Sequence, residues 1–219
     1  MRKIIDSHLH ISNWREGDYI ACFDGYAKEK GLSAINICAI PFYRSNVSNN
    51  IMLGLYKLAC PNTYVHAGIE LIEIPIDNMP HDMDALTQYK ELMEIGFDGI
   101  KMLEGKPTEH KRIGKSLNHP ALNKLYEQME KDGTHLLMHV NDPDEFWDLK
   151  RAPDWAVKQG WTYTDGSFAS YKEIQTQTIK ILESYPRLNL TLAHFFFCSK
   201  EPEILEKLFT LYPNLCVDL

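Results

Sequence analysis

The chain has 219 residues, of which 44% are hydrophobic and 24% are charged, a balance typical of a globular protein and not of a disordered or fibrous one. A chain of this length can bury one sizeable core, so we expect a single domain over residues 1–219. The net charge of -7 argues against a nucleic-acid partner, because phosphate backbones are bound by clustered Lys and Arg.

Membrane and secretory signals are not found in the sequence. No apolar run approaches the roughly 18 residues needed to cross a membrane, and no signal-peptide core follows the N-terminus. Five scattered cysteines without a CxxC pair indicate neither a disulfide framework nor a thiolate zinc site. We therefore expect a cytoplasmic protein with no membrane partner.

Short apolar runs recur along the chain, and helical patterns lie between most of them. The runs that predict strands are residues 3–8, 34–40, 63–71, 97–103, 135–140, 190–195 and 215–219. The patterns that predict helices are residues 82–95, 120–131, 171–185 and 202–212, the first two ending before Gly96 and Gly133. No glycine-rich phosphate loop follows the first strand, so the alternation favours a (β/α)8 TIM-type barrel over an open sheet. The eighth strand of such a barrel is missing from the pattern.

A long aromatic-rich stretch over residues 142–170 follows the fifth predicted strand. Loops at this end of a barrel carry function, so the stretch could form a lid over the mouth. Packing of its aromatic side chains over the barrel is an equally good interpretation.

His8 and His10 are two residues apart at the end of the first predicted strand. Side chains at this spacing leave the same face of a strand, so both imidazoles could bind one metal ion. His139 and His194 each close another apolar run. Since all strands of a barrel end at one face, we expect the four histidines to converge and hold a divalent metal there.

Other polar residues near the strand ends are candidates for supporting roles. Asp6 would share the face of His8, one step deeper, and could orient a ligating ring or simply close the barrel floor. Lys101 could be carbamylated, bind a substrate carboxylate, or reach solvent, which we expect first. Arg44 is the best candidate anchor for an anionic substrate, although a loop arginine can equally be only solvated. His66 or Glu70 could touch the substrate, but we first expect them to form a satisfied polar pair inside the barrel.

With these residues in place, the chain resembles the amidohydrolase-related family of TIM-barrel metal-dependent hydrolases. Residues 4–10, with the sequence IIDSHLH, look like that family's first-strand signature. Residues 182–194, LESYPRLNLTLAH, are similar to its helix, turn and sixth strand, and residues 212–219, YPNLCVDL, look like its seventh strand. The resemblance covers nearly the whole chain.

The resemblance implies a (β/α)8 barrel and hydrolysis of amides, esters or lactones, or related decarboxylation and hydration, in many members with zinc. It implies that His8, His10 and His139 are metal ligands and that His194 polarises the substrate carbonyl or orients the attacking water. Two features depart from the family pattern. Residues 195–197 are all Phe where the family often has a small residue, and the metal-binding aspartate of the eighth strand is missing.

Three functional hypotheses follow, and the first two take a small molecule as the substrate. The first is a hydrolase in which a divalent metal, with zinc as our first choice, activates water. The second is a lyase that decarboxylates or hydrates an unsaturated acid, for which Arg44 and Lys101 would matter more. The third is a non-catalytic metal-binding remnant. From the missing eighth strand we expect either a truncated form of a longer chain or a homo-oligomer in which a partner subunit covers the exposed edge of the sheet.

Overall fold

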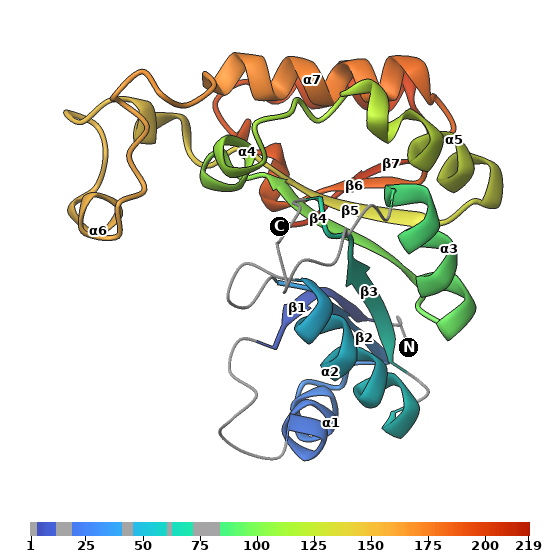
Figure 1. Cartoon of the computed structure of the whole chain (residues 1–219). Helices are drawn as coiled ribbons and strands as arrows, with labels where there is room; N and C mark the ends of the chain where they lie inside the picture. Colours follow the sequence, from blue (N-terminus) through green and yellow to red (C-terminus); the bar gives the residue numbers. More distant parts are fainter. Residues whose placement is uncertain (1–3, 12–18, 41–45, 61–62, 72–83) are drawn as a thin grey trace, which may run out of the picture. The chain divides into compact units, whose positions relative to one another are not determined.

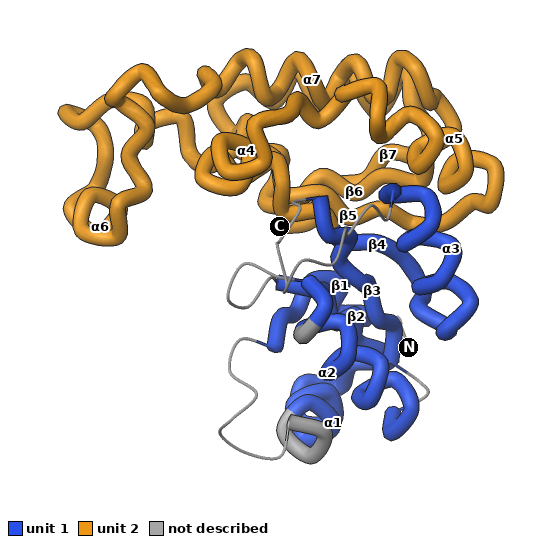
Figure 2. Tube along the Cα trace, in the orientation of Figure 1, with its two compact units in different colours: residues 1–101 blue, residues 102–219 orange. Residues whose placement is uncertain are grey.

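The computed structural model describes residues 4–11, 19–40, 46–60, 63–71 and 84–219. Two compact units make up the chain, residues 1–101 and residues 102–219 (Figure 2). Each has its own parallel strands and covering helices. The single domain expected over residues 1–219 stays a prediction.

Unit 1 alternates strands and helices from the start of its described part (Figure 1). Its elements are β1 (Ile5–His10), α1 (Tyr19–Glu29), β2 (Ala34–Cys38), α2 (Asn46–Ala59), β3 (Tyr64–Gly68), α3 (Ala85–Ile95) and the first residues of β4 (Gly99–Gly105). The strands pair in parallel in the order β1-β2-β3-β4. Their buried residues include Ile37, Cys38, Val65 and Ala67, all 0% exposed, as expected for strands covered on both faces.

Local sequence explains where α3 starts and stops. The Asp84 carboxylate accepts a hydrogen bond from the Thr87 backbone N–H, which satisfies one of the unpaired donors of the first turn. Gly96 ends the helix with φ at 106°, a left-handed conformation that glycine adopts without a side-chain clash. The predicted stop at Gly96 is confirmed.

Unit 2 begins with the end of β4 and continues the alternation. Its elements are α4 (Pro107–Ile113), the 3-10 helix η1 (Pro120–Leu122), α5 (Asn123–Asp132), β5 (His135–Val140), η2 (Asp144–Trp147), α6 (Asp154–Lys158), α7 (Tyr171–Ser184), β6 (Leu190–Leu192), η3 (His194–Phe197), α8 (Pro202–Leu211) and β7 (Leu215–Val217). Strands β5, β6 and β7 pair in parallel, and Figure 1 shows α5 and α7 on one face of them. The predicted stop at Gly133 is confirmed, with φ at 68°.

All seven predicted strands are present in the described part of the chain, and their hydrogen-bonded order follows the sequence from β1 to β7. The predicted fold class is therefore confirmed: the described residues form a TIM-type (β/α) arrangement of parallel strands without an eighth strand. Among these same residues, no helix has both the length and the apolar character needed to span a membrane.

Candidate metal and catalytic residues

The histidines of β1 form a close pair in unit 1. The Nε2 atoms of His8 and His10 are 3.0 Å apart, and the ring planes are inclined by 75°. Two nitrogens bound to one ion at about 2.0–2.1 Å are separated by about 3 Å, so the spacing fits a shared divalent cation. The side chains converge as the two-residue spacing predicts, while their role as ligands stays a prediction.

The second ring nitrogen of His10 is fixed by the neighbouring strand. Its Nδ1 lies 2.8 Å from the backbone carbonyl oxygen of Cys38 in β2, where Cys38 is paired with His10 in the sheet register. A carbonyl oxygen only accepts, so Nδ1 carries the proton and the Nε2 lone pair of a neutral His10 faces His8. A backbone carbonyl that orients a metal-binding imidazole is a common arrangement around metal sites.

Lys101 lies beside this pair. Lys101 is 2% exposed, and its Nζ is 3.1 Å from the Nε2 of His8. The expectation that the amine reaches solvent is therefore wrong. Lys101 lies in β4, where it is paired with Gly68 of β3, and its side chain is buried. A carbamylated lysine and a lysine that binds a substrate carboxylate both remain open.

Asp6 differs from the expected geometry. Its carboxylate accepts hydrogen bonds from the Tyr26 hydroxyl of α1 at 2.9 Å and from the His8 backbone N–H at 3.3 Å. The register of β1 against β2 shifts between Asp6 and Leu9, so the strict alternation that placed Asp6 on the face of His8 is broken. A role for Asp6 in orienting a ligating ring stays a prediction, and Arg44 lies outside the described residues.

A buried amide that the sequence did not single out joins three strands of unit 1. Asn36 donates to the Ser7 carbonyl at 2.9 Å, and its Oδ1 is 2.6 Å from Nδ1 of His66. Asn36 and His66 are each 5% exposed. His66 thus has Asn36 as a partner, whereas the Glu70 carboxylate accepts from the Asn46 N–H, so the expected His66–Glu70 pair is wrong. The sequence did carry a signal for this residue, because Asn36 is the one amide side chain in the apolar run of residues 34–40.

A second histidine pair lies in unit 2. His139, in β5, is 7% exposed, and its ring centroid is 5.0 Å from that of His194, which follows β6 after one intervening residue. Both rings also contact Phe197, at centroid distances of 5.6 and 5.4 Å. The side chain of His194 is 41% exposed, so it remains accessible while His139 is enclosed.

Asp142 and Lys106 form a buried ion pair next to His139. The Nζ of Lys106 lies 2.6 Å from Asp142, and these side chains are only 16% and 5% exposed. Tyr163 donates its hydroxyl proton to Asp142, and the Nε2 of His139 is 3.5 Å away. Burial acts to raise the pKa of Asp142, but the contacts with His139, Lys106 and Tyr163 outweigh it and hold that pKa below its ordinary value.

This ion pair anchors the stretch over residues 142–170 to the strand ends. Phe146, Ala156 and Tyr163 form a small buried core within the stretch, with Trp147, Trp161 and Phe168 packed against it. The Lys106 ammonium also lies over the Trp161 ring, 4.4 Å from its centroid. The aromatic side chains therefore pack on one another within unit 2, and a lid role stays a prediction. Lys106 was not among the predicted site residues; it directly follows β4, which ends at Gly105, two residues beyond the strand predicted over residues 97–103.

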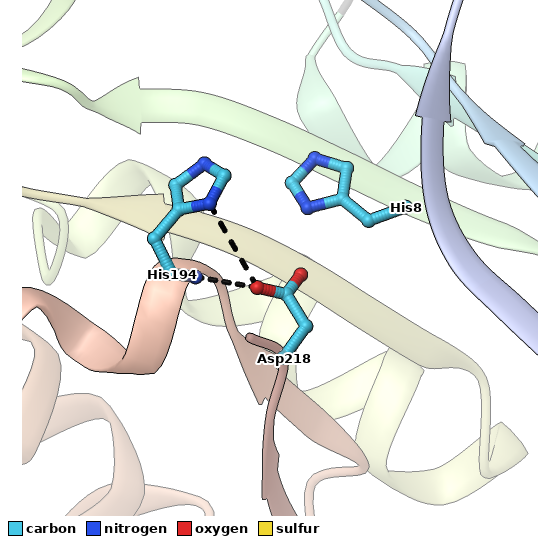
Figure 3. A group of neighbouring side chains, drawn as sticks. All are labelled: His8, His194 and Asp218. Carbon is cyan, nitrogen blue, oxygen red and sulfur yellow. Dashed lines mark hydrogen bonds and ion pairs between the residues drawn. The ribbon is translucent and has the colours of Figure 1, made fainter.

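The chain turns sharply after β6. We expected a strand as far as residue 195, but β6 ends at Leu192, and residues 194–197 have positive φ angles between 49° and 56°. The backbone N–H of His194 donates to Oδ1 of Asp218 at 2.5 Å, and Nδ1 of His194 is 3.9 Å from the same oxygen (Figure 3). Asp218 is a further acidic residue to which the sequence pattern gave no role, because it lies inside the strand predicted over residues 215–219, whereas β7 ends at Val217.

Comparison with known proteins finds similarity in structure and none in sequence. No family model and no curated protein sequence matches the chain. A Staphylococcus aureus protein assigned as an amidohydrolase matches with a TM-score of 0.60 and 14% identity, over 98% of this chain and 74% of that one. The apo form of IDCase from Metarhizium anisopliae matches with a TM-score of 0.62 and 11% identity, over 95% and 69%.

A third similar structure comes from Acinetobacter baumannii. It is assigned as a 2-pyrone-4,6-dicarboxylic acid hydrolase, holds citric acid, and matches with a TM-score of 0.56 and 14% identity over 99% of this chain and 69% of that one. At such low identities the likeness concerns the fold and not the chemistry. This chain has an amidohydrolase-like fold.

Proposed function

We propose that the protein is a metal-dependent hydrolase that cleaves an amide, ester or lactone bond of a small molecule. The observation that carries the proposal is the pair of Nε2 atoms of His8 and His10, 3.0 Å apart. The carbonyl of Cys38 fixes the proton of His10 on the other ring nitrogen, so the nitrogen that faces His8 is the one able to bind a cation.

The donor set fits a divalent ion, with zinc as our first choice. Imidazole nitrogens are ligands that zinc prefers, and His139 is the third ligand predicted from the sequence. When bound, such an ion supplies a Lewis acid and lowers the pKa of a water molecule towards about 7. A charged ammonium would oppose the ion, so Lys101, with Nζ 3.1 Å from His8 Nε2, must be neutral, carbamylated or paired with an anion when the site is loaded.

His194 is the residue we assign to proton transfer. An imidazole exchanges a proton near neutral pH, and this ring is the more exposed member of its pair, with 41% of the side chain open to solvent. His139 and Phe197 pack against it and limit its rotation. His194 would polarise the scissile carbonyl or orient the attacking water.

A lyase acting on an unsaturated carboxylic acid is the second candidate, and the burial of Lys101 favours it. A buried amine beside the histidine pair is suited to bind a substrate carboxylate, because the ion pair would form away from competing water. The similar protein from Acinetobacter baumannii is named as a hydrolase of a dicarboxylic acid, so 2-pyrone-4,6-dicarboxylate is a sensible first substrate for testing the hydrolase proposal on a carboxylate-bearing molecule.

Metal content and activity test the proposal together. The purified full chain would be stripped with a chelator, dialysed against zinc and analysed by mass spectrometry for bound metal. It would then be assayed on a panel of lactones, esters, amides and unsaturated acids that includes 2-pyrone-4,6-dicarboxylate. We expect about one or two ions per chain, and chelator-sensitive hydrolysis. Decarboxylation or hydration in place of hydrolysis would favour the lyase, and bound metal without turnover would favour the remnant.

Matched variants locate the metal. His10→Ala removes one proposed ligand and should abolish both metal retention and activity. His119→Asn is the control, because His119 is a helix-capping residue whose ring nitrogen accepts from the Ala121 N–H, and Asn is a good replacement in that role. A metal-free, chelator-insensitive wild type would contradict the proposal.

A further inference from the structure

Four consecutive residues without glycine adopt a left-handed backbone one residue after the end of β6. Their φ angles are 56° at His194, 55° at Phe195, 56° at Phe196 and 49° at Phe197. L-residues seldom adopt this conformation, because the Cβ atom approaches the following carbonyl oxygen. A run of four requires support from the surrounding structure, and such conformations concentrate at functional sites.

Asp218 supports the start of this left-handed turn with both its side chain and its backbone. Its Oδ1 accepts from the His194 N–H at 2.5 Å, and its backbone carbonyl accepts from the Phe195 N–H at 2.8 Å (Figure 3). Its own N–H donates to the Leu192 carbonyl at 3.3 Å, which ties it to the end of β6. The Asp218 side chain is 8% exposed, so little water competes for the carboxylate.

Different groups support the other end of the turn. The Tyr171 hydroxyl, from the first residue of α7, donates to the Phe197 carbonyl at 2.8 Å. Phe196 is 0% exposed and anchors the middle of the turn in the core of unit 2. The Cys198 N–H donates to the Phe195 carbonyl at 3.2 Å. The Asp218 carboxylate is therefore the side chain that holds the backbone of the turn at His194.

We propose that Asp218 is a positioning residue that orients His194 by clamping the left-handed turn. It acts through the backbone, because its Oδ1 is 3.9 Å from the Nδ1 of His194, which is too long for a hydrogen bond to the ring. The clamp fixes the Cα–Cβ direction of His194 and so the place of its imidazole beside His139. The expected effect of Asp218 on catalysis rests on the proposed function. Its expected effect on the backbone at His194 rests on the geometry of the turn alone.

Three variants of the full chain and one control variant test the clamp. Asp218→Ala removes the acceptor, whereas Asp218→Asn keeps an oxygen at the same place without the charge. On the best substrate of the panel, we expect the alanine variant to lose about 10–100-fold in kcat while its KM stays within about twofold of the wild type. The asparagine variant should keep most of the activity. Adding Phe195→Gly to Asp218→Ala should restore part of kcat, because glycine adopts positive φ without a clamp. The single Phe195→Gly variant is the control for lost packing.

Amide hydrogen exchange measured by NMR gives a readout that needs no substrate. We expect the His194 N–H to exchange at least about tenfold faster in Asp218→Ala than in the wild type, and to be largely protected in Asp218→Asn. Unchanged exchange, or an asparagine variant as impaired as the alanine variant, would overturn the proposal. Faster exchange in a chain that turns over no substrate would support the clamp and count against the proposed function alone.

Discussion

Replacing Lys106 with methionine removes the cation that faces the buried carboxylate of Asp142. Its Nζ is 2.9 and 2.6 Å from the two carboxylate oxygens, and the Asp142 side chain is 5% exposed. Removing one partner from a buried ion pair costs about 3–5 kcal/mol, because the other charge stays buried without compensation. Tyr163 and His139 still face the carboxylate, so we expect the lower end of that range, about 3 kcal/mol of unfolding free energy.

Urea denaturation of Lys106→Met would measure this loss as a lower transition midpoint at an unchanged slope. A second substitution, Asp142→Asn, removes the stranded charge, so the double variant should be more stable than Lys106→Met alone. Lys28→Met is the matched control: its side chain is 76% exposed beside Asp24, and its loss should leave the midpoint unchanged. A loss below about 1 kcal/mol for Lys106→Met, or a double variant less stable than that single one, would refute the reasoning.

Three further predictions concern other parts of the fold. Gly105→Ala should lower the stability by about 1–3 kcal/mol in the same assay, because an added Cβ would lie 2.1 Å from the His139 carbonyl oxygen. Burial lowers the pKa of His135, whose Nε2 contacts the Thr191 hydroxyl, so the unfolded chain binds more protons than the folded chain. The free energy of unfolding should therefore fall as the pH drops through about 6.5, the ordinary pKa of histidine. His135→Gln should flatten this pH dependence, measured by denaturation curves at several pH values. Ser170→Ala should cost about 1 kcal/mol, measured by the shift in the urea midpoint, because it removes the capping box of α7.

Much of the fold could be predicted from the sequence because its signals are local. Apolar runs mark strands that are buried on both faces, and Gly96 and Gly133 mark helix ends through their backbone freedom. The convergence of His8 and His10 also follows from the two-residue period of a strand.

The features that could not be predicted from the sequence depend on geometry between elements. The register of β1 against β2 shifts after Asp6, whose carboxylate accepts from Tyr26 of α1, and no residue type in that strand indicates either feature. The left-handed turn at residues 194–197 has no glycine to signal it, and its support comes from Asp218, 24 positions after His194. The Lys106–Asp142 pair likewise joins the ends of two strands that are separated in sequence.

The most direct test of the metal proposal is an anomalous-scattering map from crystals of the zinc-loaded full chain. We predict a zinc peak about 2.0–2.1 Å from the Nε2 atoms of His8 and His10, with the Nδ1 of His10 still bonded to the Cys38 carbonyl. No peak at these two nitrogens, or zinc bound only at other residues, would contradict the account.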